Sequence, residues 1–418
     1  MNVELVNTGS ELMLGRVLNT HQQFLCRRLA DLGHVVTRQV AIADTGSEIQ
    51  AAVREALSRA DLVITTGGLG PTSDDLTREL IAELLGKKLV ENKDVLAHIE
   101  NFFAKRGRPR PAKTSVETFV PEGAIFFLNA TGTAPGLAMK ISNPKSGIRN
   151  PKWLIMLPGP PRELRPMFDA AVVPLLKREF ADEIFICRTI LTTGIGESRV
   201  QEFVEADLQP LVKRGLEIGY CARPGAVDVR LTASGAGAEK IVRDGEAVVQ
   251  KILGANIFGF DDDEIEQVVV QLLMECKKTL VLAESCTGGN VAHRLTNVPG
   301  ASEVFLGGVV SYSNAAKEKF LGVCAESLAA HGAVSEAVAR EMAAGAREKF
   351  GSDFAMAITG IAGPGGGSPD KPVGTVFIAL ASSTGVAVKK FLNAWDRATF
   401  KEVAATQALE WLRQTLSA

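Results

Sequence analysis

One segment in the second half of the chain combines residue types that can attack a carbonyl carbon. Residues 283–289 read Ala-Glu-Ser-Cys-Thr-Gly-Gly, between an apolar run from Thr279 to Ala283 and a helical pattern from Asn290 to Leu295. A strand, a turn and a helix in this order place Ser285 at the edge of a parallel sheet where ligands usually bind. Glycines let the backbone approach a ligand, and the amides at the helix start are expected to hold an anion.

A possible proton acceptor follows in the same half of the chain. Tyr312 and Lys317 come just after another apolar run. A lysine can activate a serine nucleophile because a neutral amine takes the hydroxyl proton. Burial or a cationic neighbour must then lower the pKa of Lys317 far enough to supply the neutral amine.

Ordinary structural explanations stay open for each of these residues. Ser285 could cap the helix that follows, and Tyr312 could end a strand with its hydroxyl in water. Lys317 could be a solvated helix lysine, because Glu318 and Lys319 follow it. Cys286 could be a buried small thiol and not a nucleophile.

A glycine-rich segment, Thr65 to Asp75, forms a second candidate site. It follows an apolar strand pattern and opens a helical one. Its three glycines permit tight turns and close approach to a phosphate, and Asp74 and Asp75 could hold a hard divalent cation. The alternative is a simple turn in which Ser73 or Asp74 caps the helix. The first predicted strand ends at Gly9-Ser10-Glu11. Because strand ends in a parallel sheet can be neighbours, these residues could lie beside the glycine-rich segment.

Length and composition limit the classes of protein to consider. The chain has 418 residues, 46% of them hydrophobic and 22% charged, which suggests roughly two or three globular domains. The net charge of −2 gives no basic field for nucleic acid. The cysteines are scattered without a C-x-x-C pair, so we expect neither a zinc ribbon nor a disulfide framework. We see no signal peptide and no apolar stretch of about 18 residues, and expect a cytoplasmic protein.

The first 170 residues or so alternate between strand and helix patterns. Strands are predicted at 3–7, 35–41, 61–65 and 153–157, and helices at 17–32, 47–58 and 74–85. This alternation predicts a parallel sheet covered by helices on both faces. Residues 140–152 are rich in Asn, Pro, Lys, Ser and Gly, which predicts an exposed loop.

The pattern changes at about residue 172. Strands at 184–191, 217–221 and 227–232, with helices after Gly196 and at 238–253, predict a small α+β unit. A second α/β domain begins near residue 260, where a capping signal from Asp261 to Glu264 opens a helix that ends at Cys276. A strand at 354–358 and helices near 335–350 and 398–416 complete it.

Four motifs of the first domain resemble the amino-terminal domain of the CinA family. They are T-G-G-L-G-P-T-S-D-D-L-T at 66–77, like the signature loop of the molybdopterin-binding fold, G-S-E-L-M-L-G-R-V-L-N-T at 9–20, N-A-T-G-T-A-P-G at 129–136 and L-P-G-P-P-R-E at 157–163. The resemblance implies metal-dependent ADP-ribose pyrophosphatase activity with a divalent metal ion (Mg, Mn or Co) as cofactor and potassium as a further candidate. It makes Asp74 and Asp75 metal ligands. The substrate-binding residues would be Gly67, Gly68, Gly70, Thr72, Gly132 and Thr133.

The second half is similar to the carboxy-terminal CinA domain, whose stand-alone relatives deamidate nicotinamide mononucleotide. The motifs that match lie at 283–289, 299–302, 307–314, 331–335, 359–367 and 371–376. The resemblance implies Ser285 as nucleophile, Lys317 as base and Tyr312 as a proton relay, with no cofactor. Substrate would be bound by Cys286, Thr287, Gly288, Asn314, Thr359, Gly360, Gly363, Gly365 and Arg397, and amides around Cys286 to Gly288 would form an oxyanion hole. Lys401 stands where the family frequently has a second arginine.

The two resemblances cover nearly the whole chain and predict its organisation. A molybdopterin-binding-like three-layer α/β domain is expected at 1–171, a KH-like α+β linker at 172–256 and the α/β amidase domain at 257–418. A KH module that clamps nucleic acid needs a G-x-x-G loop, whereas Gly194-Ile195-Gly196-Glu197 offers only G-x-G. We therefore expect a spacer or dimerisation element, a homodimer, and no nucleic-acid or membrane partner.

Three functions compete at this stage. The first is hydrolysis of nicotinamide mononucleotide, with ADP-ribose as a second small-molecule substrate, in pyridine nucleotide salvage. The second is a non-catalytic nucleotide sensor associated with competence or DNA damage. The third is molybdenum-cofactor handling by the first domain alone, which leaves the amidase motifs unexplained. The presence of Ser285, Tyr312 and Lys317 favours the enzyme.

Overall fold

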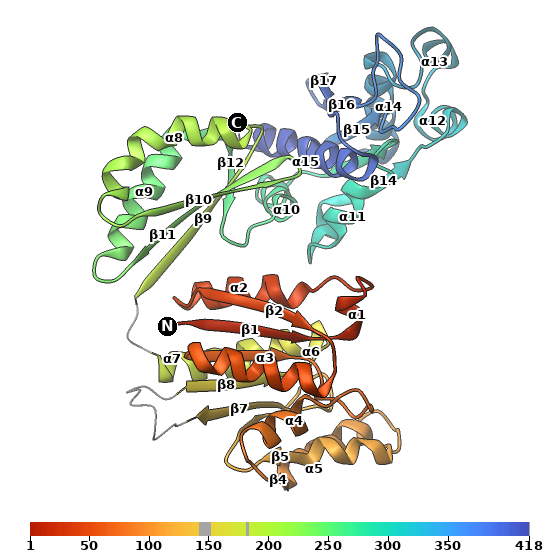
Figure 1. Ribbon diagram of the computed structural model, residues 1–418. Coiled ribbons are helices and arrows are strands. Elements are labelled where there is room, and N and C mark those ends of the chain that lie inside the picture. Colours follow the sequence, from red (N-terminus) through yellow and green to blue (C-terminus); the bar gives the residue numbers. More distant parts are fainter. Residues whose placement is uncertain (142–151, 181–183, 418) are drawn as a thin grey trace. The chain divides into compact units, whose positions relative to one another are not determined.

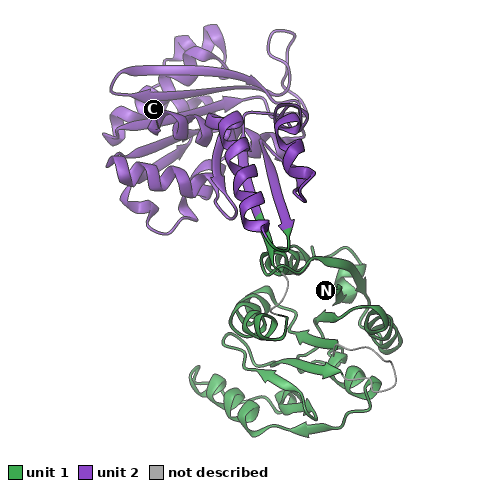
Figure 2. Cartoon of the chain, turned by 90° about the vertical axis from the view of Figure 1, so that its left-hand side faces the viewer, with its two compact units in different colours: residues 1–187, 234–236 green, residues 188–233, 237–418 purple. Residues whose placement is uncertain are grey.

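The structure is a computed structural model that describes residues 1–141, 152–180 and 184–417. It divides into two compact units, residues 1–187 with 234–236 and residues 188–233 with 237–418 (Figure 2). The predicted boundary at residue 171 falls inside a continuous helical segment made of α6 (Pro161–Met167), η2 (Phe168–Val172) and α7 (Val173–Glu179). Residues 142–151 of the predicted loop lie outside the described residues.

The first unit is built on a six-stranded sheet. The order is β2 (Val36–Ile42), β1 (Val3–Thr8), β3 (Leu62–Thr66), β8 (Lys152–Leu157), β7 (Gly136–Ile141) and β6 (Ile125–Phe127). Of these strands, β2, β1, β8 and β7 are seen one below another in Figure 1. The first four strands of the sheet are parallel, as predicted. At the other edge, β7 pairs antiparallel with β8, and β6 pairs antiparallel with β7. A separate pair joins β4 (Leu89–Glu91) to β5 (Phe119–Pro121).

Helices cover both faces of this sheet and make three layers. One face packs against α2 (Thr20–Asp31), α6 and α7, and the other against α3 (Gly46–Arg59), α4 (Thr77–Leu84) and α5 (Lys93–Ala104). Successive side chains of a strand point to opposite faces of the sheet, so apolar strands need a helical layer on each side. In β1, Leu5 belongs to one core and the next residue, Val6, to the other. The short helix α1 (Ser10–Met13) and the 3-10 helix η1 (Ala112–Thr118) complete the unit.

The second unit contains two sheets. The antiparallel sheet of the KH-like part has the order β10 (Glu217–Arg223), β11 (Ala226–Ser234), β9 (Phe185–Thr193) and β12 (Ile257–Phe260), and carries α8 (Glu197–Val212) and α9 (Ala238–Leu253) (Figure 1). Leu191 and Phe258 of this part belong to the same hydrophobic core as α10 (Ile265–Cys276) and α15 (Arg397–Leu416). The KH-like part therefore shares a core with the carboxy-terminal domain.

The carboxy-terminal sheet is again the middle of three layers. Its order is β14 (Phe305–Val310), β13 (Leu280–Glu284), β15 (Phe354–Gly360), β16 (Thr375–Ser382) and β17 (Gly385–Leu392). β13 is parallel to both neighbours, and the last two strands are antiparallel. One face packs against α10, α11 (Asn290–Thr296) and α15, and the other against α12 (Asn314–Leu321), α13 (Ala325–His331) and α14 (Glu336–Phe350).

The predicted α/β class and the three kinds of domain are confirmed, and several helix ends differ for local reasons. α2 begins at Thr20 and not at residue 17, because the Asn19 side chain accepts hydrogen bonds from the amides of His21 and Gln22. α10 begins at Ile265, directly after the predicted capping segment, but its capping box is formed by Glu264 and Gln267 and not by Asp261 and Glu264. α4 begins at Thr77 after the N-cap residue Leu76, which makes no side-chain cap, so the prediction that Ser73 or Asp74 caps this helix is wrong.

Candidate active site

Three strand ends meet at the serine of the carboxy-terminal domain. Glu284, the last residue of β13, pairs with Val310 of β14 and with Ile358 of β15. The Ser285 amide then donates to the Ile358 carbonyl at 2.9 Å, and the Ser311 amide donates to the Glu284 carbonyl at 2.8 Å. Ser285 therefore lies at the carboxyl edge of the sheet, as the sequence predicted.

Lys317 contacts Ser285 directly. Its Nζ lies 3.0 Å from Ser285 Oγ and donates to the Ser311 carbonyl at 2.7 Å. The Lys317 side chain is 1% exposed, so the alternative of a solvated helix lysine is wrong. Burial lowers the pKa of Lys317, and the neighbouring Cys286 opposes this shift only in part. A neutral amine at this position can accept the Ser285 proton over the same contact.

The turn that carries Ser285 is fixed by a buried carboxylate that the sequence analysis did not identify. Glu284 is 1% exposed, and its carboxylate accepts hydrogen bonds from the amides of Gly289, Val291 and Ala292 at 2.9, 3.2 and 2.8 Å. The protein thus holds its own anion at the start of α11, so the predicted use of these amides for a ligand anion is wrong. Ser285 is not the cap either, since the N-cap is Gly289. A glutamate six residues before the predicted helix start at Asn290 was the available signal.

The next residues of the turn have different roles. Burial raises the pKa of the Cys286 thiol to about 12, which keeps it protonated and unsuited to attack. Thr287 is fully buried, and its Oγ1 has no partner among the described residues. The Gly288 amide donates to the Ser285 carbonyl at 3.1 Å and is therefore not free to bind an oxyanion. The backbone amides of Cys286 and Thr287 act against this rise in the pKa of the Cys286 thiol.

Tyr312 and Arg397 form a second pair. The Tyr312 side chain is 63% exposed, and its hydroxyl accepts a hydrogen bond from Arg397 Nη2 at 2.6 Å. Arg397 Nη1 also donates to the Gly363 carbonyl at 2.9 Å. Tyr312 follows Ser311, whose carbonyl holds Lys317, so the pair adjoins the Ser285–Lys317 contact along the chain.

The remaining predicted residues of this site divide into packing and exposed positions. Thr359 is 1% exposed and donates through Oγ1 to the Ala333 carbonyl at 2.8 Å. A Cβ at Gly360 would lie 2.8 Å from the Thr375 carbonyl, so this glycine is needed for packing. Asn314, at the start of α12, is exposed, and nothing lies within 4 Å of a Cβ at Gly365.

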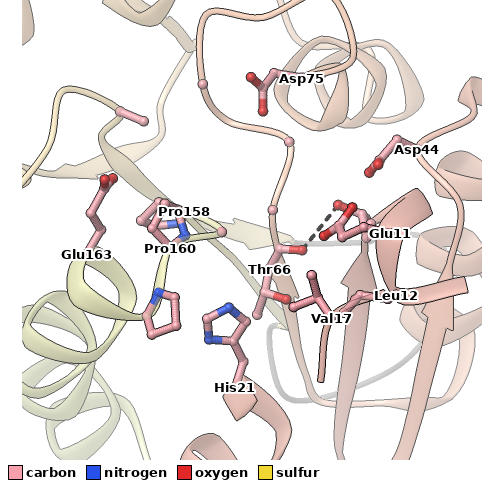
Figure 3. Close-up of a pocket in the computed structure, with 18 of the residues that line it drawn as sticks. Glu11, Leu12, Val17, His21, Asp44, Thr66, Asp75, Pro158, Pro160 and Glu163 are labelled. Atoms are coloured by element: carbon pink, nitrogen blue, oxygen red, sulfur yellow. Dashed lines mark hydrogen bonds between the residues drawn. The ribbon is translucent and has the colours of Figure 1, made fainter. Parts of the chain in front are cut away.

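The first unit has a cavity of about 670 Å³ at the ends of its parallel strands. Carboxylates surround it from two helices and two loops, with His21 below (Figure 3): Glu11 lies in α1, Glu163 in α6, and Asp44 and Asp75 in loops. Asp74, Glu117, Thr133 and the glycines Gly67, Gly68 and Gly70 also line it. The predicted proximity of the first and third strand ends is thus found, because Glu11 and Asp75 line one cavity.

The glycine-rich loop is shaped by packing around Asp75. A Cβ at Gly70 would lie 2.6 Å from Asp75 Oδ2, and one at Gly68 would lie 2.0 Å from Thr77 Oγ1. Asp75 accepts hydrogen bonds from the Thr72 amide at 3.0 Å and from the Thr72 hydroxyl. Gly132 donates to Asn129 Oδ1, and a Cβ there would lie 2.4 Å from the Glu163 carboxylate. Thr72 thus holds the Asp75 carboxylate, and the missing side chain of Gly132 leaves room for the Glu163 carboxylate.

Glu117 is a further residue of this cavity that the sequence analysis missed. It comes from η1, is fully buried, and its Oε1 accepts a hydrogen bond from Thr133 Oγ1 at 3.0 Å. Its Oε2 has no partner within the described part of the chain. Burial raises the pKa of Glu117 to about 7, and the charges of Asp75 and Glu163 act in the same direction. A lone glutamate in a threonine-rich segment gave no sequence signal.

The predicted metal ligands fit an ion that shares its coordination with a substrate. Across residues 1–141, 152–180 and 184–417, no group of three or more His, Cys, Asp or Glu side chains converges on one point. Magnesium, however, is usually bound by one or two carboxylates plus substrate phosphates and water. Asp74 and Asp75 can supply such ligands at the cavity wall.

Comparison with known proteins places each part of the chain. Residues 4–178 match the family model "Probable molybdopterin binding domain", 187–259 the "Damage-inducible protein CinA KH domain" and 262–416 the "CinA C-terminal domain". The chain is thus an α/β protein with a molybdopterin-binding-like domain, a KH-like part and a CinA carboxy-terminal domain.

Relatives align along the whole chain. A CinA-like protein of Akkermansia muciniphila is 43% identical over 413 residues, which are 99% of this chain and 97% of the relative. A CinA-like protein of Kosmotoga olearia is 40% identical over 423 residues, 100% of this chain and 99% of the relative. The crystal structure of the competence/damage inducible protein CihA from Agrobacterium tumefaciens is 38% identical and covers 37% of this chain and 94% of its own, with a TM-score of 0.36. The chain belongs to the CinA family.

Within the described residues, the structure has no helix that is both long enough and apolar enough to cross a membrane.

Proposed function

We propose that the carboxy-terminal domain hydrolyses the carboxamide of nicotinamide mononucleotide to nicotinate mononucleotide and ammonia. The observation that carries this proposal is the 3.0 Å contact between buried Lys317 Nζ and Ser285 Oγ. The choice of substrate comes from the motifs at 283–289 and 307–314, which resemble those of amidases that act on this nucleotide.

The reaction follows from the groups present. Lys317 takes the Ser285 proton while Oγ forms a bond to the amide carbon. The tetrahedral intermediate collapses, the C–N bond breaks, and the nitrogen leaves as ammonia with the proton returned by Lys317. A water molecule then gives a proton to Lys317 and attacks the ester, which releases nicotinate mononucleotide and restores Ser285. Lys317 returns to its starting state in each half of the reaction.

Ammonia release from nicotinamide mononucleotide by the full chain tests the proposal. The wild type is expected to release ammonia, whereas Ser285→Ala is expected to bind the nucleotide, as measured by calorimetry, without turnover. Normal turnover by Ser285→Ala would show that Ser285 is not the nucleophile.

The cavity of the first unit favours a second activity. We infer that it cleaves ADP-ribose with water to AMP and ribose 5-phosphate in a metal-dependent reaction, so that both domains serve pyridine nucleotide salvage. Among the described residues, six acidic side chains line the cavity: Glu11, Asp44, Asp74, Asp75, Glu117 and Glu163. A pyrophosphate would be repelled by such a wall unless a divalent cation lay between, and Asp74 and Asp75 would hold that cation. The cation would neutralise charge on the phosphates.

A further inference from the structure

The helix α11 follows the turn that carries Ser285 directly, and the two form one piece of structure. Glu284 accepts hydrogen bonds from the amides of Gly289, Val291 and Ala292 and so joins the end of β13 to the start of the helix. α11 has only seven residues and packs against α10 and α15 (Figure 1). A helix this short is not stable by itself in water, so its neighbours must hold it. Whatever holds α11 therefore also holds the turn.

A single guanidinium ties α11 to both neighbouring helices. Arg294 Nε and Nη2 donate to Glu266 Oε2 of α10 at 3.2 and 2.7 Å, and Nη1 donates to Thr406 Oγ1 of α15 at 2.9 Å. The side chains of Arg294 and Glu266 are 16% and 14% exposed, so the ion pair is largely shielded from water. Hydrogen bonds between charged groups are stronger than neutral ones. All three guanidinium nitrogens thus have acceptors within the protein, which suits Arg294 to holding helices and not to binding substrate.

A second hydrogen bond fixes the other end of α11. Asn290 Nδ2, in the first residue of the helix, donates to Glu402 Oε1 of α15 at 3.0 Å. Asn290 and Arg294 are four residues apart, and so are Glu402 and Thr406, so each pair shares one face of its helix. A cavity of about 460 Å³ lies beside these four residues. Because a cavity supplies no packing contacts, the hydrogen bonds must do more to position α11 there.

The KH-like part reaches the same point of α15. Gly225, in the turn between β10 and β11, has a φ of +77°, and a Cβ there would lie 3.2 Å from Thr406 Cβ and 3.6 Å from Val403 Cα. A residue without a side chain allows this close approach. The next residue, Ala226, packs against the core of the carboxy-terminal domain. The hairpin thus supports the residue that accepts the hydrogen bond from Arg294.

We propose that Arg294, Thr406 and the β10–β11 hairpin form a clamp that positions the turn carrying Ser285 against Lys317. Lys317 belongs to α12, which packs on the opposite face of the sheet from α11. The 3.0 Å contact between Ser285 Oγ and Lys317 Nζ therefore depends on elements that the sheet separates. A displacement of about 1 Å at a reacting group can cost about 100-fold in rate. This inference rests on the proposed amidase function and adds the residues that position its nucleophile, with the KH-like part among them.

Two substitutions of Thr406 separate a hydrogen-bonding role from a packing role. Valine has nearly the shape of threonine but cannot accept from Arg294, whereas serine keeps the hydroxyl and lacks the methyl group. Thr406→Val should lower kcat for ammonia release by the full chain about 10-fold and change KM less than about 2-fold, and Thr406→Ser should keep kcat within about 2-fold. A loss in Thr406→Ser but not in Thr406→Val would assign Thr406 to packing and overturn the clamp. An unchanged kcat in Thr406→Val would overturn it as well.

Arg294→Gln and Gly225→Ala test the two sides of the clamp. Arg294→Gln should lower kcat about 10- to 100-fold, and Gly225→Ala about 3- to 10-fold because the added Cβ presses on Thr406. The double variant should lose less than the product of the two losses, because both act through Thr406, and losses that multiply fully would overturn the role of the hairpin. Arg347→Gln is the control, because Arg347 is a half-buried arginine of α14 that donates to the Asp353 carbonyl, and kcat should stay within about 2-fold.

Hydrogen exchange of the segment 284–296 reports on the turn without catalysis. Thr406→Val and Arg294→Gln should speed exchange there about 10-fold or more and leave the α14 segment 336–350 unchanged. If the wild type releases no ammonia, the amidase proposal fails, and this exchange alone decides on the clamp. Faster exchange in Thr406→Val but not in Thr406→Ser would support the clamp, and equal exchange in the wild type and Thr406→Val would reject it.

Discussion

Replacing Glu284 by glutamine is expected to loosen the turn that carries Ser285. The carboxylate has two oxygens, of which Oε2 accepts from Gly289 and Val291 and Oε1 accepts from Ala292. Glutamine has a single carbonyl oxygen, so it can keep the first pair only by turning its NH₂ group toward the Ala292 amide. One charge-assisted hydrogen bond is lost, and the glutamine NH₂ group is left facing the Ala292 amide, so that two buried donors meet. The turn is expected to lose about 2–3 kcal/mol of stability.

Hydrogen exchange of the segment 284–296 in the full chain measures this cost locally. A loss of about 2–3 kcal/mol makes exchange at the start of α11 roughly 30- to 150-fold faster, because each 1.4 kcal/mol is a factor of ten. Ammonia release should fall as well, since Ser285 follows Glu284 directly. Glu336→Gln is the matched control, because Glu336 is exposed and makes an ion pair with Arg340 at the surface. Exchange within about 3-fold of the wild type in Glu284→Gln would refute the reasoning.

Three further predictions follow from the same two sites. Amidase kcat should rise with pH through the pKa of Lys317, which burial places below the usual range of lysine, and a pH-independent kcat would contradict the role of Lys317 as base. Lys317→Arg should abolish ammonia release, because a guanidinium stays charged. The folded-state pKa of Glu117, about 7, lies above its unfolded value, so this group's contribution to stability is complete at low pH and is lost as pH rises to about 7. Glu117→Gln should therefore raise the free energy of unfolding of the first unit by about 3 kcal/mol at pH 8 in EDTA and change it little at pH 4. Urea unfolding measures this, and a free energy of unfolding that varies equally with pH in the wild type and the variant would argue against it. Asp75→Ala should remove metal-dependent ADP-ribose cleavage while ammonia release stays within about 2-fold, and unchanged cleavage would reject Asp75 as a ligand.

Local patterns in the sequence predicted the elements that carry the carboxy-terminal site. The strand before Ser285 and the helix from Asn290 were visible because an apolar run, a small-residue turn and a helical stripe follow each other directly. The antiparallel strands β6 and β7 of the first sheet were missed. β6 has only three residues, and in the described segment 128–135 no helix lies between β6 and β7 to mark a parallel unit.

Contacts between distant segments could not be predicted from local patterns. The Ser285–Lys317 contact joins residues 32 positions apart. Residue types suggested the pair, and the motif resemblance favoured it over a helix cap and a solvated lysine. The hydrogen bond to buried Glu117 comes from Thr133, which lies in another segment. Thr359 was predicted to bind the ligand, but its hydroxyl donates to the Ala333 carbonyl. The anion site at α11 was predicted from a general property of helix starts, and Glu284 overrides that property here.

Ammonia release from nicotinamide mononucleotide by the neighbouring variants Ser285→Ala and Cys286→Ala tests the central claim most directly. The account predicts that Ser285→Ala loses turnover by about 10³-fold or more, because the nucleophile is gone. Cys286→Ala should keep turnover within about 10-fold, because the Cys286 thiol, with its pKa raised to about 12, only fills space. Turnover that survives in Ser285→Ala and disappears in Cys286→Ala would contradict the account and make the thiol the nucleophile.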